Sequence, residues 1–129
     1  MGNKYLDILT QTVRHTRHGV SETGAVSIEI IVGDQSSNAD APAEVVDFSR
    51  GGFRLRWGAA LQKGEPLEFR CTDHSSELSL ALPGTVRWCR ELADKRFEAG
   101  VQFEQEIDYE HLGQLFIAGF LSAEEAAAH

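Results

Sequence analysis

The chain is poor in sulfur and in proline, with two cysteines, one methionine and three prolines among its 129 residues. Cys71 and Cys89 match no metal-binding spacing, so the sequence predicts no metal site. Both cysteines lie in strand-like runs, which favours a pair of small half-buried side chains. A disulfide or a redox role is the alternative.

Long apolar runs are also missing, since none approaches the roughly 20 residues that a membrane-spanning helix needs. The N-terminus has no charged segment followed by an apolar one, which argues against a secretory signal. Leu6 occupies the position where N-myristoylation requires Ser or Thr. We therefore expect a cytoplasmic protein with no membrane insertion.

Positive charge is scarce, because 12 Lys and Arg face 20 Asp and Glu, for a net charge of −8. This balance argues against a nucleic-acid polymer as partner. The cations are concentrated between Val45 and Arg90, where seven Lys or Arg face five acids. From Phe97 onward there are seven acids and no Lys or Arg. A locally cationic region in an acidic protein suits a compact anion.

Enzyme signatures are absent as well. The sequence contains no HExxH, nucleophile elbow or phosphate-binding Walker loop. The five histidines accompany no nucleophile motif; they are His15, His18, His74, His111 and His129. We therefore expect no catalytic residues, no cofactor and no enzymatic activity.

Apolar and polar residues alternate over most of the chain, as in half-buried strands. In one run, Phe53, Leu55 and Trp57 are expected to face inward, and Arg54 and Arg56 outward. Six or seven short strands with turns between them favour a small antiparallel barrel or sandwich. The predicted strands are residues 25–32, 44–48, 53–57, 67–71, 78–82, 84–89 and 97–103.

Two helices are expected to flank the strands. Helical spacing of apolar residues predicts an amphipathic helix over residues 4–17, ending near Gly19. A second helix is capped by Asp108, and its apolar stripe is expected to serve a homodimer. That stripe consists of Leu112, Leu115, Phe116 and Phe120.

The chain is expected to form one domain over residues 1–129. Its N-terminal helix and arginine segment would occupy residues 1–20. A β-barrel would occupy residues 24–105, and the C-terminal helix residues 107–127.

The run Asp47-Phe48-Ser49-Arg50-Gly51-Gly52 places a carboxylate, a hydroxyl, a guanidinium and two glycines in one turn between strands. Polar groups on a turn that a rigid sheet holds suit a small-ligand site. The same residues also suit a turn without any ligand. Asp47 and Ser49 would then cap the turn through backbone hydrogen bonds, and Gly52 would be a hairpin glycine.

Three short motifs occur in order along the chain. The first is Asp-x-Ser-x-x-Gly at Asp47, Ser49 and Gly52. The others are Gly84-Thr-Val-Arg-Trp88 and Phe97-Glu-Ala-Gly-Val-Gln-Phe103. This combination resembles the PilZ domain family, over roughly residues 14–105. The resemblance implies a six-stranded antiparallel barrel and a bacterial receptor for the second messenger cyclic di-GMP, not an enzyme.

The resemblance also implies roles for the turn residues. Asp47 would accept hydrogen bonds from a guanine edge, and Ser49 would contact a ligand oxygen or its own turn. Gly52 would let the backbone take a positive φ. Arginines would donate to guanine O6 and N7 or to the phosphates.

The family's Arg-x-x-x-Arg motif is altered, because only two residues separate Arg14 from Arg17 and His18 stands at the second position. Arg50 is a candidate for the missing cation. The predicted cyclic di-GMP site consists of Arg14, Arg17, His18, Asp47, Ser49, Arg50 and Gly52. In the alternative interpretation, Arg14 and Arg17 are cations at a helix end, and Arg50, Arg54 and Arg56 form an exposed strand face.

Two functions compete at this point. The first is a receptor that binds cyclic di-GMP and passes the signal to an unidentified downstream protein. The second is an atypical PilZ module that binds no nucleotide and acts in protein–protein contact through its acidic C-terminal helix. The altered arginine motif favours the second function, and the intact Asp-x-Ser-x-x-Gly turn favours the first.

Overall fold

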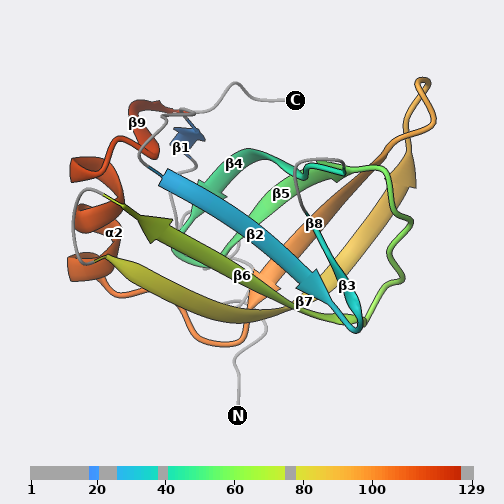
Figure 1. The fold of residues 1–129 in the computed structure, drawn as a ribbon, viewed down its shortest axis with the longest axis horizontal. Coiled ribbons are helices and arrows are strands. Elements are labelled where there is room, and N and C mark those ends of the chain that lie inside the picture. Colours follow the sequence, from blue (N-terminus) through green and yellow to red (C-terminus); the bar gives the residue numbers. More distant parts are fainter. Residues whose placement is uncertain (1–17, 21–25, 38–40, 75–77, 126–129) are drawn as a thin grey trace, which may run out of the picture.

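The computed structural model describes residues 18–20, 26–37, 41–74 and 78–125. The predicted helix over residues 4–17 lies outside this part of the chain. The described residues form one antiparallel sheet and one helix (Figure 1). In chain order the elements are β1 (His18–Val20), β2 (Val26–Val32), β3 (Gln35–Ser36), β4 (Glu44–Ser49), β5 (Gly52–Trp57), β6 (Pro66–Asp73), β7 (Ser79–Glu91), β8 (Phe97–Phe103), α2 (Tyr109–Ile117) and β9 (Leu121–Glu125).

The sheet curls into a half-barrel with the strand order β3-β2-β6-β7-β8-β5-β4-β1-β9. The six strands that the resemblance implies are wrong, since the described part of the sheet has seven strands of five or more residues and the short β1 and β3. The strands expected over residues 78–82 and 84–89 are one strand, β7, and β9, which follows the helix and pairs with β1, was not expected. The expected strand over residues 97–103 is confirmed as β8.

Alternation decides which side chains fill the inside of the half-barrel. Phe53, Leu55 and Trp57 of β5 are buried, as the sequence predicts. The centre of the core is a cluster of phenylalanine rings whose centroids lie 5.2 to 6.3 Å apart. These rings belong to Phe48, Phe53, Phe69, Phe103 and Phe120. Cys71 and Cys89 are both free.

The helix is shorter than the sequence predicts. It begins at its cap Asp108, whose carboxylate accepts a hydrogen bond from the His111 backbone at 2.7 Å. It ends because Gly119 takes a left-handed φ of 83° and Phe120 N–H donates to the Leu115 carbonyl at 3.0 Å. The expected helix to residue 127 is therefore wrong, and residues 121–125 form β9.

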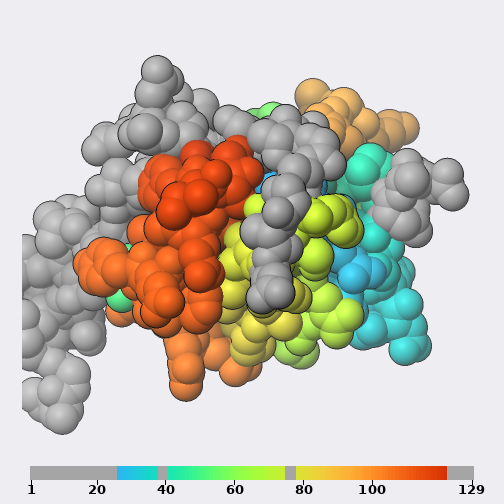
Figure 2. Space-filling model, turned by 60° about the vertical axis from the view of Figure 1, so that its left-hand side comes forward, coloured from blue at the N-terminus to red at the C-terminus, as the bar shows by residue number. Residues whose placement is uncertain are grey.

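The apolar stripe of α2 packs on the chain's own sheet. Leu115 and Phe120 are buried in the core, and Leu112 and Phe116 pack against it. Figure 2 shows α2, in orange to red, beside the yellow-green strands. The apolar stripe of α2 is therefore not available for the homodimer contact that the sequence predicted. Within the described residues, no helix has the length and apolar character to cross a membrane.

Candidate functional site

The turn between β4 and β5 is closed by its own serine. Ser49 Oγ accepts a hydrogen bond from Gly51 N–H and donates to the Gly52 carbonyl, both at 3.3 Å. Ser49 and Gly52 are partners at the end of the hairpin. The serine therefore fixes the turn that presents its neighbours.

Gly52 is required by close packing between strands. A Cβ at this position would lie 2.0 Å from the Val101 carbonyl oxygen on β8. The φ of Gly52 is not in the left-handed region, so the expected positive φ is wrong. The glycine instead lets β5 approach the β8 backbone.

Arg50 contacts the segment that leads to α2. Its Nε donates to the Ile107 carbonyl at 2.8 Å, and its guanidinium lies 3.9 Å from the centroid of the Tyr109 ring. A weaker ion pair joins Arg50 to Glu106 at 3.9 Å. Arg50 thus ties the turn to the helix, and another arginine lies beside Asp47.

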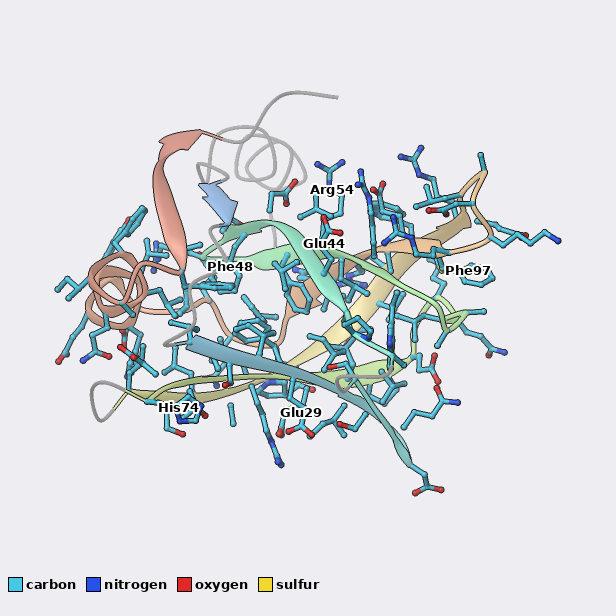
Figure 3. The ribbon with its side chains drawn as sticks, turned by 45° about the horizontal axis from the view of Figure 1, so that its top comes forward. Glu29, Glu44, Phe48, Arg54, His74 and Phe97 are labelled. Carbon is cyan, nitrogen blue, oxygen red and sulfur yellow. The ribbon has the colours of Figure 1, made fainter. Side chains whose placement is uncertain are left out.

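That arginine is Arg54. Its Nη2 lies 2.7 Å from Oδ2 of Asp47, and Asp47 is only 2% exposed. The Arg54 side chain is 15% exposed, so the interpretation of this residue as part of a solvated strand face is wrong. Figure 3 shows Arg54 on the outer side of the sheet, away from Phe48.

Strand register places Asp47 and Arg54 in a row that crosses five strands. Asp47 of β4 is opposite Gly19 of β1 and Arg54 of β5. Arg54 is opposite Gly100 of β8, and Gly100 is opposite Trp88 of β7. The row brings together Asp47, Trp88 and Gly100, one residue from each of the three sequence motifs, with the guanidinium of Arg54.

The Trp88 ring lies over Gly100. A Cβ on Gly100 would be 2.1 Å from Nε1 of the indole, so only glycine leaves room for the ring. Trp88 is nevertheless 40% exposed, so its outer surface remains accessible to a flat partner. The Arg90 guanidinium lies 5.9 Å from the indole centroid.

A second row of charges runs beside the first. Arg56 of β5, Glu98 of β8 and Arg90 of β7 are opposite one another. Glu98 is 0% exposed and accepts from Arg56 Nε at 2.9 Å and from Arg90 Nη2 at 2.7 Å. Arg54 Nη1 lies 3.9 Å from the same carboxylate.

These contacts decide the charge of Glu98. Burial raises the pKa of this carboxyl, but the hydrogen bonds from Arg56 and Arg90 and the charge of Arg54 outweigh it and hold the pKa below its usual value. Sequence reasoning missed Glu98 as a site residue. The available signal was a lone acid between apolar positions of a predicted strand.

We call these two rows the charged face. It lies on the outer side of β4, β5, β8 and β7 and contains three arginines and two carboxylates, for a local charge of +1. Its members are Asp47, Arg54, Arg56, Trp88, Arg90, Glu98 and Gly100.

The N-terminal candidates are only partly placed. Arg14 and Arg17 lie outside the described residues, whereas the backbone of His18 pairs with Phe48 in the sheet. The next residue, Gly19, is opposite Asp47.

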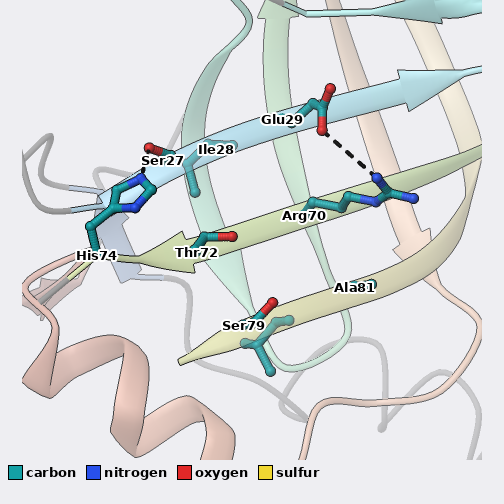
Figure 4. Close-up of a pocket in the computed structure, with 9 residues that line it drawn as sticks. Ser27, Ile28, Glu29, Arg70, Thr72, His74, Ser79 and Ala81 are labelled. Atoms are coloured by element: carbon teal, nitrogen blue, oxygen red, sulfur yellow. Dashed lines mark hydrogen bonds and ion pairs between the residues drawn. The ribbon is translucent and has the colours of Figure 1, made fainter. Parts of the chain in front are cut away.

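The outer side of β2, β6 and β7 has a different character. Ser27, Thr72 and Ser79 form a row across the three strands and line a pocket of ≈ 480 Å³ (Figure 4). Ser27 Oγ is 2.7 Å from His74 Nε2, and Arg70 pairs with Glu29 at 3.9 Å. We call this the hydroxyl face. The described residues hold no His, Cys, Asp or Glu cluster suited to a metal ion.

Among known families, the model of the PilZ domain matches residues 11–118 of the chain. The chain belongs to the PilZ domain family. PilZ domains are binding and adaptor domains. The match includes every element that contributes to the charged face.

A solved structure has a similar fold: the inhibitor of motility MotI/DgrA from Bacillus subtilis, with a TM-score of 0.52 and 13% sequence identity. The similarity covers 81% of this chain and 48% of that protein, so the chain spans about half its length. No curated protein shows significant sequence similarity to the chain.

Proposed function

We propose that this PilZ domain is a cytoplasmic receptor that binds cyclic di-GMP on its charged face and passes the signal to a protein partner. The observation that carries the proposal is the row of Asp47, Arg54 and Trp88 across one side of the sheet. These three side chains offer the contacts that a guanine base requires.

The guanine contacts follow from chemistry. A guanidinium donates to O6 and N7, and Arg54 supplies one with little exposure and a fixed position. A carboxylate accepts from the amino and imino groups at the opposite edge of the base, which is the role of Asp47. The exposed surface of the Trp88 ring provides a stacking platform.

The N-terminal segment would complete the site. β1 pairs with β4, and Gly19 of β1 lies opposite Asp47. Arg14 and Arg17 would donate to the phosphates, and His18 is a weaker candidate because imidazole lacks the planar fork of donors that a guanidinium offers. Ser49 and Gly52 contribute by holding the turn.

A second candidate function is protein contact without a nucleotide. It is favoured because the polar side chains of the turn already have partners within the chain. Ser49 hydrogen-bonds within its own hairpin, and Asp47 pairs with Arg54. The acidic segment around α2 would then contact the partner, with Tyr109 and Ile117 as exposed apolar residues.

Calorimetric titration with cyclic di-GMP separates the two functions. The receptor proposal predicts binding to the wild-type chain and an affinity loss of about tenfold or more in Trp88→Leu, because base stacking contributes about 1–3 kcal/mol. Ile117→Ala is the control, since this side chain lies on α2 and is 88% exposed. Absence of heat up to high micromolar nucleotide would reject the receptor and leave the protein-contact function.

A further inference from the structure

Arg56 and Arg90 are held on a shared buried carboxylate. Glu98 lies between them on the central strand of the three and accepts one hydrogen bond from each, at 2.9 and 2.7 Å. Their side chains remain 34% and 63% exposed, whereas Glu98 is 0% exposed. The two guanidinium groups therefore cover the carboxylate and face the solvent.

Glu98 holds the two arginines in place but leaves most of their N–H donors available. A guanidinium has five N–H donors, and Glu98 takes one hydrogen bond from each group. The buried anion also reduces the repulsion between two cations that would otherwise separate. The remaining charge of the trio is +1, from two guanidiniums and one carboxylate.

We propose that Arg56 and Arg90, positioned by Glu98, form a phosphate subsite that takes the anionic oxygens of a phosphodiester. This inference rests on the proposed function in one respect, namely that the phosphodiester belongs to the nucleotide whose base contacts Arg54 and Trp88. Residues two apart on a strand are about 6.6 Å apart, so one nucleotide reaches both rows.

Hydrogen-bond donors on a pre-ordered pair of guanidiniums match the geometry of a phosphate group. The hydroxyl face shows why Glu98 matters. There Arg70 is exposed and pairs with Glu29 and Glu68, so two partly exposed carboxylates compete with any anion for one guanidinium. On the charged face, Arg56 and Arg90 share one carboxylate, Glu98, which is buried beneath them.

The test is ¹⁵N NMR of the arginine Nε–H groups in the full chain, titrated separately with cyclic di-GMP and with inorganic pyrophosphate. Arg56→Lys, Arg90→Lys and Arg70→Lys assign the three resonances. We expect the signals of Arg56 and Arg90 to shift with both probes and that of Arg70 to stay in place.

A binding measurement accompanies the spectra. Arg90→Gln leaves Glu98 with Arg56 at 2.9 Å and Arg54 at 3.9 Å, and its melting temperature is measured alongside to show that it is folded. The variant should weaken cyclic di-GMP binding about tenfold, the value of one charge-assisted hydrogen bond. Arg70→Gln is the control and should bind as the wild type does.

The outcomes distinguish this subsite from the receptor function. If cyclic di-GMP binds with wild-type affinity to Arg90→Gln and the two resonances do not move, the subsite is wrong and the receptor stands. If pyrophosphate shifts both resonances but cyclic di-GMP does not bind, the subsite stands as a site for another phosphate and the receptor falls. If neither probe moves them, the subsite is rejected.

Discussion

The two outer faces of this sheet have the same strand geometry but differ in how their ion pairs are exposed to solvent. On the charged face, Asp47 and Glu98 are buried beneath arginines, and Gly100 leaves room for the ring of Trp88. On the hydroxyl face, Glu29 and Arg70 pair in solvent among serines and threonine.

The difference has an energetic meaning. Buried carboxylates must be compensated, and removal of one partner leaves an uncompensated charge. Exposed pairs contribute little, because water and salt screen them. Our proposal that the charged face binds a ligand would account for its buried ion pairs and its exposed aromatic ring together.

The largest expected effect comes from removing Glu98. Glu98→Ala should lower the free energy of unfolding by about 3–5 kcal/mol, because three arginines lose their shared buried partner. Glu29→Ala, the matched change on the hydroxyl face, should cost no more than about 1 kcal/mol. Urea unfolding of both variants measures the difference. Equal losses would contradict the contrast between the faces.

Gly52→Ala is next in size. The added Cβ would meet the Val101 carbonyl at 2.0 Å, and a backbone atom cannot move aside as a flexible side chain does. We expect a loss of about 1–3 kcal/mol in unfolding free energy. Gly58→Ala is the control, since nothing lies within 4 Å of its Cβ position. If Gly52→Ala melted at as high a temperature as Gly58→Ala, β5 and β8 would have to be farther apart than this contact requires.

Acid should reduce the stability that the ion pairs of the charged face contribute. The pKa of Glu98 is lowered in the folded protein, so its ionised form adds stability above the ordinary glutamate pKa of about 4.3, and that stability is lost as the pH falls through the lowered value. Glu98→Gln should remove this part of the pH dependence. Unfolding curves from pH 6 to pH 3 measure it, and parallel profiles for the wild type and the variant would show that Glu98 does not contribute.

The smallest effect concerns the cysteines. Cys71 lies beneath the hydroxyl face, where burial, with a further contribution from Asp73, raises its pKa to about 12. Cys89 is partly exposed on β7, between Trp88 and Arg90. A thiol reagent at pH 8 should therefore modify one cysteine in the folded chain and both after denaturation. Rapid modification of both in the native state would show that the region around β6 opens easily.

Much of the fold was predictable because alternation is a local property. The strand over residues 97–103 and the inward residues of β5 follow from it directly. The end of the helix was harder. Gly119 was visible as a weak helix former, but its left-handed φ and the hydrogen bond from Phe120 to Leu115 turned it into a stop.

The site was only half predictable. Asp47 and Ser49 are recognisable from their motif, but the partner of Asp47 depends on the register between β4 and β5. Alternation assigns Arg54 and Glu98 to the outer side, and an outer residue is normally exposed. Glu98 is recognisable as a lone acid in a predicted strand, but its burial depends on arginines that the register brings from the two neighbouring strands.

The central claim is that the charged face, and not the hydroxyl face, binds cyclic di-GMP. Calorimetric titration of Arg54→Gln and Arg70→Gln tests it most directly, with the melting temperature of each variant measured alongside. We expect Arg54→Gln to lose about tenfold or more in affinity, as the loss of a guanine contact requires, and Arg70→Gln to bind as the wild type does. Equal affinities in the two folded variants would contradict the claim.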